Sequence, residues 1–117
     1  MAAPNIVNVS SVYGKTAVAS LSTSTTNIVT NSGGSGTVLK INSFYVSNFN
    51  TAAIAANVML NRSGTTYFLA PGASVPSFST LTVIGKDTAI YLEEGDILQA
   101  NASSTTAQVV CSYETIG

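Results

Sequence analysis

The sequence contains no histidine, no tryptophan and a single cysteine among its 117 residues. The missing histidine excludes catalytic triads built on imidazole and metal sites with histidine ligands, and it removes the commonest general base. One cysteine cannot form a disulfide within the chain, so the core must hold the fold together. These absences argue against an enzyme, and we expect no catalytic residue and no cofactor.

Charged residues are also scarce: they make up 8% of the chain, with four Lys and Arg against five Asp and Glu. An average soluble domain carries about 25%. Four scattered cations cannot neutralise a phosphate backbone, so we expect no nucleic-acid partner. A polar but nearly uncharged surface is typical of surface that contacts other proteins. We interpret the chain as an assembly component; the alternative is a small β-domain with a bland surface.

No apolar run approaches the roughly 18 residues that span a membrane, so we expect no membrane partner. Residues 1–5 show neither the basic nor the apolar region of a signal peptide, and we expect the chain to stay in the cytosol. Three glycosylation sequons, at Asn8, Asn61 and Asn101, need secretion to be used, and we discount them. The length predicts one domain over residues 1–117, with residues 1–5 as a flexible arm.

Short runs of β-branched residues with period-two alternation recur along the chain, separated by Gly, Asn, Ser and Pro. Such runs are typical of strands. We expect about nine strands, packed as a single-domain antiparallel β-sandwich of the jelly-roll kind. The expected strands cover residues 6–12, 16–22, 25–30, 37–49, 52–61, 66–69, 78–84, 88–92, 97–102 and 107–114.

Some runs support sharper predictions. Apolar positions within 37–49 change parity near Asn42 and Ser43, which predicts a β-bulge or a bend there. Segment 52–61 has helix propensity at its start, but its alternation favours a strand. Segment 70–76 contains two prolines and a glycine, so we expect a loop that no sheet ladder crosses. We expect 97–102 and 107–114 to pair as the last hairpin.

Few residues are candidates for chemistry. Cys111 alternates in phase with Val109 and Tyr113, which predicts a buried and inert thiol. Ser11 and Lys15 are the closest approach to a nucleophile and base, but nothing in the sequence orients them. Residues 31–36 form a glycine-rich loop without the Lys-Ser or Lys-Thr of a phosphate-binding loop.

The only acidic concentration consists of Asp87, Glu93, Glu94 and Asp96. Its spacing does not match a calcium-binding EF-hand loop, and the carboxylates surround one turn instead of facing each other across a cleft, as hydrolysis would need. We favour a solvated hairpin in which Gly95 adopts positive φ and the Asp96 side chain bonds to the turn. A cation held by Asp87, Glu94 and Asp96 is the alternative.

The C-terminal part of the sequence carries three motifs in succession: YLEEGD at residues 91–96, LQANAS at 98–103 and SYE at 112–114. Together they resemble small virion structural proteins of tailed phages, particularly those of marine cyanobacteria, and the resemblance covers residues 37–117. It implies a β-sandwich component of the particle. The expected role is a decoration or cement protein on the capsid, with a tail, neck or fibre component as the alternative.

That resemblance also implies partners. We expect the protein to bind the major capsid protein and copies of itself, as a homotrimer at three-fold positions, and to be part of the virion after assembly in the host cytoplasm. The arm at residues 1–5, or the loop from Gly33 to Gly36, would contact a neighbour. A fibre component that binds host glycans would instead show exposed aromatics and amides, such as Tyr67 and Phe68 beside Asn61.

Overall fold

The computed structural model describes residues 11–117, which form nine strands and one short 3-10 helix. No helix in this part of the chain is long and apolar enough to cross a membrane. The elements are β1 (Val12–Ser20), β2 (Thr26–Thr30), β3 (Val38–Asn48), β4 (Ile54–Arg62), β5 (Thr65–Val75), β6 (Ser79–Ile84), η1 (Lys86–Thr88), β7 (Ile90–Leu92), β8 (Ile97–Ala102) and β9 (Ala107–Ile116).

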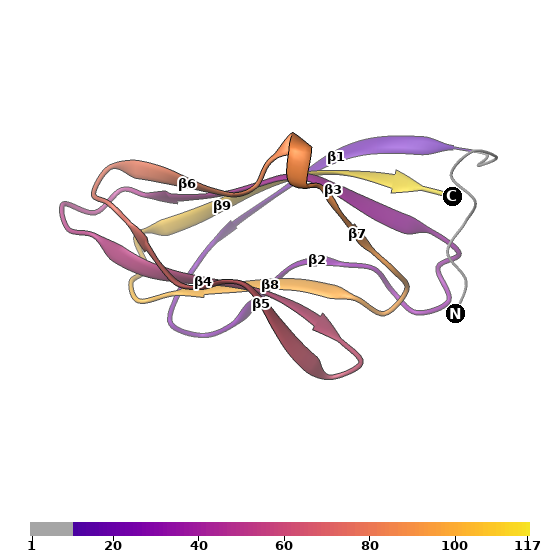
Figure 1. Cartoon of the computed structure of the whole chain (residues 1–117), viewed down its shortest axis with the longest axis horizontal. Coiled ribbons are helices and arrows are strands. Elements are labelled where there is room, and N and C mark those ends of the chain that lie inside the picture. Colours follow the sequence, from indigo (N-terminus) through magenta and orange to yellow (C-terminus); the bar gives the residue numbers. More distant parts are fainter. Residues whose placement is uncertain (1–10) are drawn as a thin grey trace.

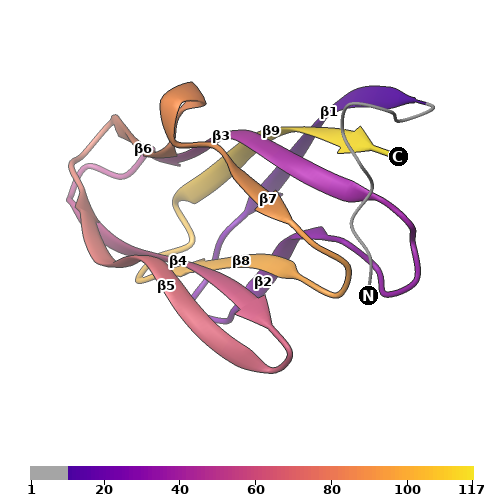
Figure 2. The same ribbon diagram turned by 45° about the vertical axis from the view of Figure 1, so that its right-hand side comes forward.

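Two antiparallel sheets face each other, as Figures 1 and 2 show. Sheet A has the order β1-β9-β3-β6, and β7 also pairs with β3; sheet B has the order β2-β8-β4-β5. Because β9 pairs along the whole of β3, β6 and β7 share the other edge of β3 and act as one strand broken at η1. The expected β-sandwich is confirmed, and this strand order is that of a jelly roll.

Most connections cross from one sheet to the other. Strands β4 and β5, in contrast, are neighbours in one sheet and are joined by a tight hairpin turn. Its two residues, Ser63 and Gly64, both have positive φ, at 55° and 81°, as a two-residue hairpin turn requires. Strands β8 and β9, by contrast, lie in different sheets. The expected hairpin between residues 97–102 and 107–114 is therefore wrong: β9 buries its alternate residues by pairing between β1 and β3 instead.

The core lies between the sheets and is built from the inward residues of each strand. In β3, Leu39 and Ile41 are buried before the register shift, and Phe44 and Val46 after it. The shift lies between Ile41 and Ser43 in the pairing with β9, so the predicted bulge is confirmed. The extra residue turns the second apolar pair back toward sheet B, and both halves of this long strand serve one core.

The expected strand boundaries are wrong near the N-terminal end. We expected one strand to end at residue 12 and another to begin at 16, but β1 runs unbroken through Tyr13 and Gly14. Continuous antiparallel pairing with β9, from Val12 to Ser20, outweighs the low strand propensity of glycine. The expected residues 6–10 of the first strand, and the arm at 1–5, lie outside the described residues.

The expected loop at 70–76 is also wrong, since β5 continues to Val75. Proline is tolerated in a strand at a sheet edge, and β5 is an edge strand of sheet B. Irregularities in the pairing with β4, between Ala56 and Val58 and between Val58 and Met59, accommodate Pro71 and Gly72. Gly72 adopts a φ of 59° and its amide donates to the Asn57 side chain. Strand formation at 52–61 is confirmed.

Neighbouring residues on β3 offer a test of this assignment of faces. Phe44 is fully buried while Tyr45 points to the outer side of sheet A. Replacing Phe44 with Ala should lower the free energy of unfolding by about 3–5 kcal/mol, because it leaves a cavity between the sheets. The matched variant Tyr45→Ala should cost about 1 kcal/mol or less. Denaturant titration of both variants measures the difference, and equal losses would contradict the assignment.

Candidate functional site

Three of the five acidic residues, Glu93, Glu94 and Asp96, lie at the turn between β7 and β8, which links sheet A to sheet B. Glu94 and Asp96 are buried there, whereas Glu93 remains half exposed. Asp87 lies exposed on η1, outside the turn. Within residues 11–117 no group of three His, Cys, Asp or Glu side chains could hold a metal ion. The expected hairpin is wrong, since the turn joins two sheets. The turn is solvated only in part: Glu93 and Gly95 are exposed, whereas Glu94 and Asp96 are buried.

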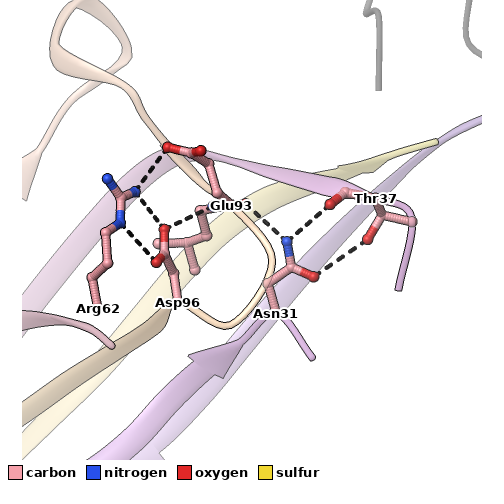
Figure 3. A network of polar contacts seen from close by, with 6 residues as sticks. Asn31, Thr37, Arg62, Glu93 and Asp96 are labelled. Carbon is pink, nitrogen blue, oxygen red and sulfur yellow. Dashed lines mark hydrogen bonds and ion pairs between the residues drawn. The ribbon is translucent and has the colours of Figure 1, made fainter. Parts of the chain in front are cut away.

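Asp96 is paired with Arg62, the last residue of β4, through two parallel hydrogen bonds, as Figure 3 shows. Arg62 Nε lies 2.9 Å from Oδ1, and Nη2 lies 2.6 Å from Oδ2. The amide of Glu93 also donates to Oδ2, over 2.8 Å, and Gly95 has a φ of 89°. The predicted turn bond and positive φ are thus confirmed. The Arg62 partner, from a distant strand, could not be read from the sequence.

The contact between Arg62 and Asp96 shifts the pKa values of both side chains toward their charged forms. Burial alone would raise the pKa of Asp96, but the hydrogen bonds from Arg62 and from the Glu93 amide outweigh burial and bring the pKa below its usual value. The same hydrogen bond raises the pKa of Arg62, with further attraction from Glu93, whose carboxylate lies 3.1 Å from Nη2. Asp96 and Arg62 are therefore both charged at neutral pH, and each neutralises the other.

Asn31, directly after β2, connects the β2–β3 loop, which also crosses between the sheets, to this turn (Figure 3). Its side-chain amide donates to the carbonyls of Thr37 and Leu92, over 3.0 and 2.9 Å, and its Oδ1 accepts from Ser35. Its backbone exchanges hydrogen bonds with Asp96 and Gly95. The ends of the glycine-rich loop at 31–36 are thereby anchored.

A pocket of about 330 Å³ lies over this cluster, lined by Arg62, Ser63 and residues 93–96. Its polar groups are already engaged with one another: Glu94 accepts from the Gly36 amide, and both oxygens of Asp96 are occupied. No buried side-chain polar atom of the described residues lacks a partner. We therefore interpret the cluster as a structural tie between crossing loops.

The remaining chemical candidates stay apart. Cys111 is fully buried, and burial raises the pKa of its thiol to about 12, which confirms the expectation of an inert cysteine. The Ser11 hydroxyl donates to the carbonyl of Gly117, while Lys15 is exposed on β1. The structure does not bring a hydroxyl nucleophile and a lysine base together here.

The surface contains many large apolar side chains that are not buried. Across the outer face of sheet A, the register aligns Val18, Val110 and Tyr45 in one row from β1 through β9 to β3. Phe49 and Phe78 form a second group, which we call the aromatic end; they flank the last β3–β6 pair, Asn48 with Ser79. Sequence alternation alone did not single out these positions. Alternation tells on which face of a strand a side chain lies, but not whether other residues cover that face.

The outer face of sheet B is rich in side-chain amides. Asn57 donates to Asn101, which donates to Thr25, and Gln99 donates to Asn27. Phe68 is exposed and pairs with Met59 on this side, two residues along the strands from the pair Asn61 with Thr66. Tyr67, on the alternate position of β5, points to the other side. The cluster expected at Asn61, Tyr67 and Phe68 is thus only partly brought together.

Comparison with known proteins adds no relative: no protein-family model matches the chain, and no curated protein matches it.

Acid should weaken the tie between the crossing loops. Asp96 has a lowered pKa, so its contribution to stability is present above the ordinary carboxyl pKa of about 4 and is lost as the pH falls through its folded value. At pH 6, Asp96→Asn should cost about 1–3 kcal/mol, because one charged acceptor of Arg62 is lost. The gap between wild type and variant should shrink below pH 4.

Denaturant titration from pH 7 to pH 2.5 measures this gap. Asp87→Asn, which changes an exposed carboxylate on η1, serves as the control and should change stability little at any pH. A gap between wild type and Asp96→Asn that is the same at pH 6 and pH 3 would contradict the role assigned to the ion pair.

Proposed function

We propose that the protein is a decoration or cement protein of a tailed-phage particle, which binds the major capsid protein and stabilises the shell. The aromatic end carries this proposal. Phe78 is 70% exposed and Phe49 is 51% exposed, although neither ring gains from contact with water. Burying such a side chain stabilises a protein or complex by roughly 1.5–3 kcal/mol, and a free monomer lacks this stabilisation at both positions.

The backbone at Phe78 supports the same interpretation. Its φ is 49°, in the left-handed region that bulky residues rarely adopt. Such a conformation costs about 1–3 kcal/mol and is typically retained where the position of the side chain matters for function. The jelly roll thus presents two phenylalanines at one end, ready to enter an apolar pocket on another protein.

The scarcity of charge supports a particle component as well. With only 8% charged residues, much of the surface can be covered by other subunits without desolvating ions. A decoration protein also needs only modest contacts at each site. A ligand at about a hundred times its dissociation constant stabilises its partner by roughly 2.7 kcal/mol per site, and a shell offers many equivalent sites.

The motifs at residues 91–103 and 112–114 supply the link to phage virions through their resemblance to virion structural proteins. The structure gives these motifs local roles: YLEEGD contains the crossing turn with Asp96, while LQANAS and SYE lie in β8 and β9. Location in the virion, assembly in the host cytoplasm and a homotrimer at three-fold positions remain predictions that follow from the resemblance.

Deleting the gene from the phage that carries it provides the test. Shells without the protein should release their genome at a lower temperature than wild-type shells, and adding the purified protein back should restore the original temperature. Phe49→Ser/Phe78→Ser, combined in one chain, should fail to restore it, because the apolar contact is lost. Tyr91→Ser, which changes an exposed aromatic residue on β7, is the control and should restore it.

Absence of the chain from purified particles, or deletion shells that withstand heat as well as wild type, would overturn the proposal. Electron microscopy of the particles should find the protein on the outside of the capsid. Density at the tail or neck instead would favour the alternative location.

A fibre component that binds glycans is the second candidate, and the outer face of sheet B favours it. Phe68, 57% exposed, lies beside an amide-rich surface, and amides with a flat aromatic ring can bind sugar hydroxyls and ring faces. On a glycan array, wild type should bind and Phe68→Ala should lose binding. Tyr67→Ala, on the other side of β5, should retain it. No binding by wild type would dismiss this candidate.

A further inference from the structure

The two sheets have four edges, and three of them carry features that discourage pairing with another chain. In sheet B, β2 has only five residues and a register shift, and β5 contains Pro71 and two register shifts. The far edge of sheet A is broken between β6 and the three-residue β7. Short strands, prolines and bulges are the usual protection of an exposed sheet edge.

Strand β1 has none of these features. It is nine residues long, contains no proline, and pairs with β9 without any register shift. At about 3.3 Å per residue, it presents an edge roughly 30 Å long. Lys15 is its single charged residue, and within residues 11–117 no strand pairs with its outer side. A long, regular and nearly uncharged edge is a ready template for another strand.

The hydrogen bonds at its two ends show which residues face outward. The Gly117 amide donates to the Ser11 carbonyl, and the Leu21 amide donates to the Ala107 carbonyl. In an antiparallel ladder, residues bond to a given neighbour at every second position. The odd-numbered residues of β1 therefore bond to β9, and the even-numbered residues direct their N–H and C=O groups away from it. These are Val12, Gly14, Thr16, Val18 and Ser20.

We propose that β1 pairs antiparallel with β1 of a second copy of this chain, around a two-fold axis at Thr16. Thr16 is the middle residue of the strand, so this register overlaps all nine residues. Thr16 then pairs with Thr16 of the second copy, and Gly14 with Val18. All five outward residues of each copy become hydrogen-bonded, giving about ten bonds across the axis.

The side chains fit this register. Val18 is 73% exposed in the single chain, and a Cβ at Gly14 would meet no atom within 4 Å. Pairing places Val18 of each copy beside the open space at Gly14 of the other. Beyond Gly14, the outer face of the second copy continues with its Glu114 and Lys40, and Lys15 lies opposite Ala17 and not opposite another charge.

The contact is closed, because each copy uses the one unprotected sheet edge that residues 11–117 present and leaves no further such edge to extend the assembly. A second copy also matches the strand in length and pattern, which an unrelated strand does only by chance. This inference rests on the proposed function in that a shell component is expected to associate with itself. It names the contact and gives the pair two-fold symmetry, in place of the expected trimer.

Sedimentation equilibrium of the purified full chain tests the proposal, with a dimer as the expected mass. Thr16→Lys places two ammonium groups directly opposite each other at the axis and should weaken dimerisation at least tenfold. Thr82→Lys puts the same exposed substitution on the outer face of sheet A, on β6, and should leave the dimer intact. Thr16→Pro, which removes an outward N–H but no bond to β9, should also give monomers.

Circular dichroism and thermal melting establish that each variant is folded. Hydrogen exchange then reports on the register: the amides of Gly14, Thr16 and Val18 should exchange at least tenfold more slowly in wild type than in Thr16→Lys. A chain that is monomeric at all concentrations overturns the proposal, as does a dimer or trimer that both Thr16 variants leave intact.

The two proposals fail separately. If Thr16→Lys disrupts the dimer and the wild-type dimer does not bind phage shells, the result supports the β1 contact and contradicts the decoration role. Binding to shells by a chain that is monomeric in solution, with Thr16→Lys binding as well as wild type, supports the decoration role and overturns the β1 contact.

Discussion

The hydrogen-bonded ion pair between Arg62 and Asp96 joins parts of the chain that the jelly roll would otherwise leave loosely connected. Strands that alternate between two sheets need crossing connections at each end, and each connection brings polar backbone into the edge of the core. Asp96 meets this requirement in the β7–β8 turn by binding both the Arg62 guanidinium and a backbone amide. Asn31 does the same for the β2–β3 loop.

These contacts give the acidic residues of the turn a structural role. Both oxygens of the Asp96 carboxylate accept hydrogen bonds, from the Arg62 guanidinium and from the Glu93 amide, so this carboxylate has no free oxygen for a metal or a substrate. On the surface of the protein, large apolar side chains remain exposed although few charged residues surround them. A surface of this composition is stable in water only at a cost, which contact with other subunits would recover.

The exposed features lie in different places and suit different contacts. The two residues of the aromatic end belong to the β3–β4 and β5–β6 loops, while β1 lies along an edge of sheet A. Figure 1 shows these loops and β1 as separate parts of the fold. One surface presents two side chains and the other presents a row of backbone groups. A protein that binds a shell and pairs with itself needs two such surfaces that do not compete.

The sequence by itself determined where most strands lie and which face of each is apolar, because alternation is a local property. It missed residues 13–15 of β1 and residues 70–75 of β5. It predicted the bulge near Asn42, the buried thiol of Cys111 and the turn bond of Asp96 from neighbouring residues alone. Only the tertiary structure decided that β8 and β9 belong to different sheets, that Pro71 is tolerated at an edge, and that Arg62 neutralises Asp96. Each of these depends on which distant strand lies alongside, and pairing between distant strands is set by the packing of the whole core.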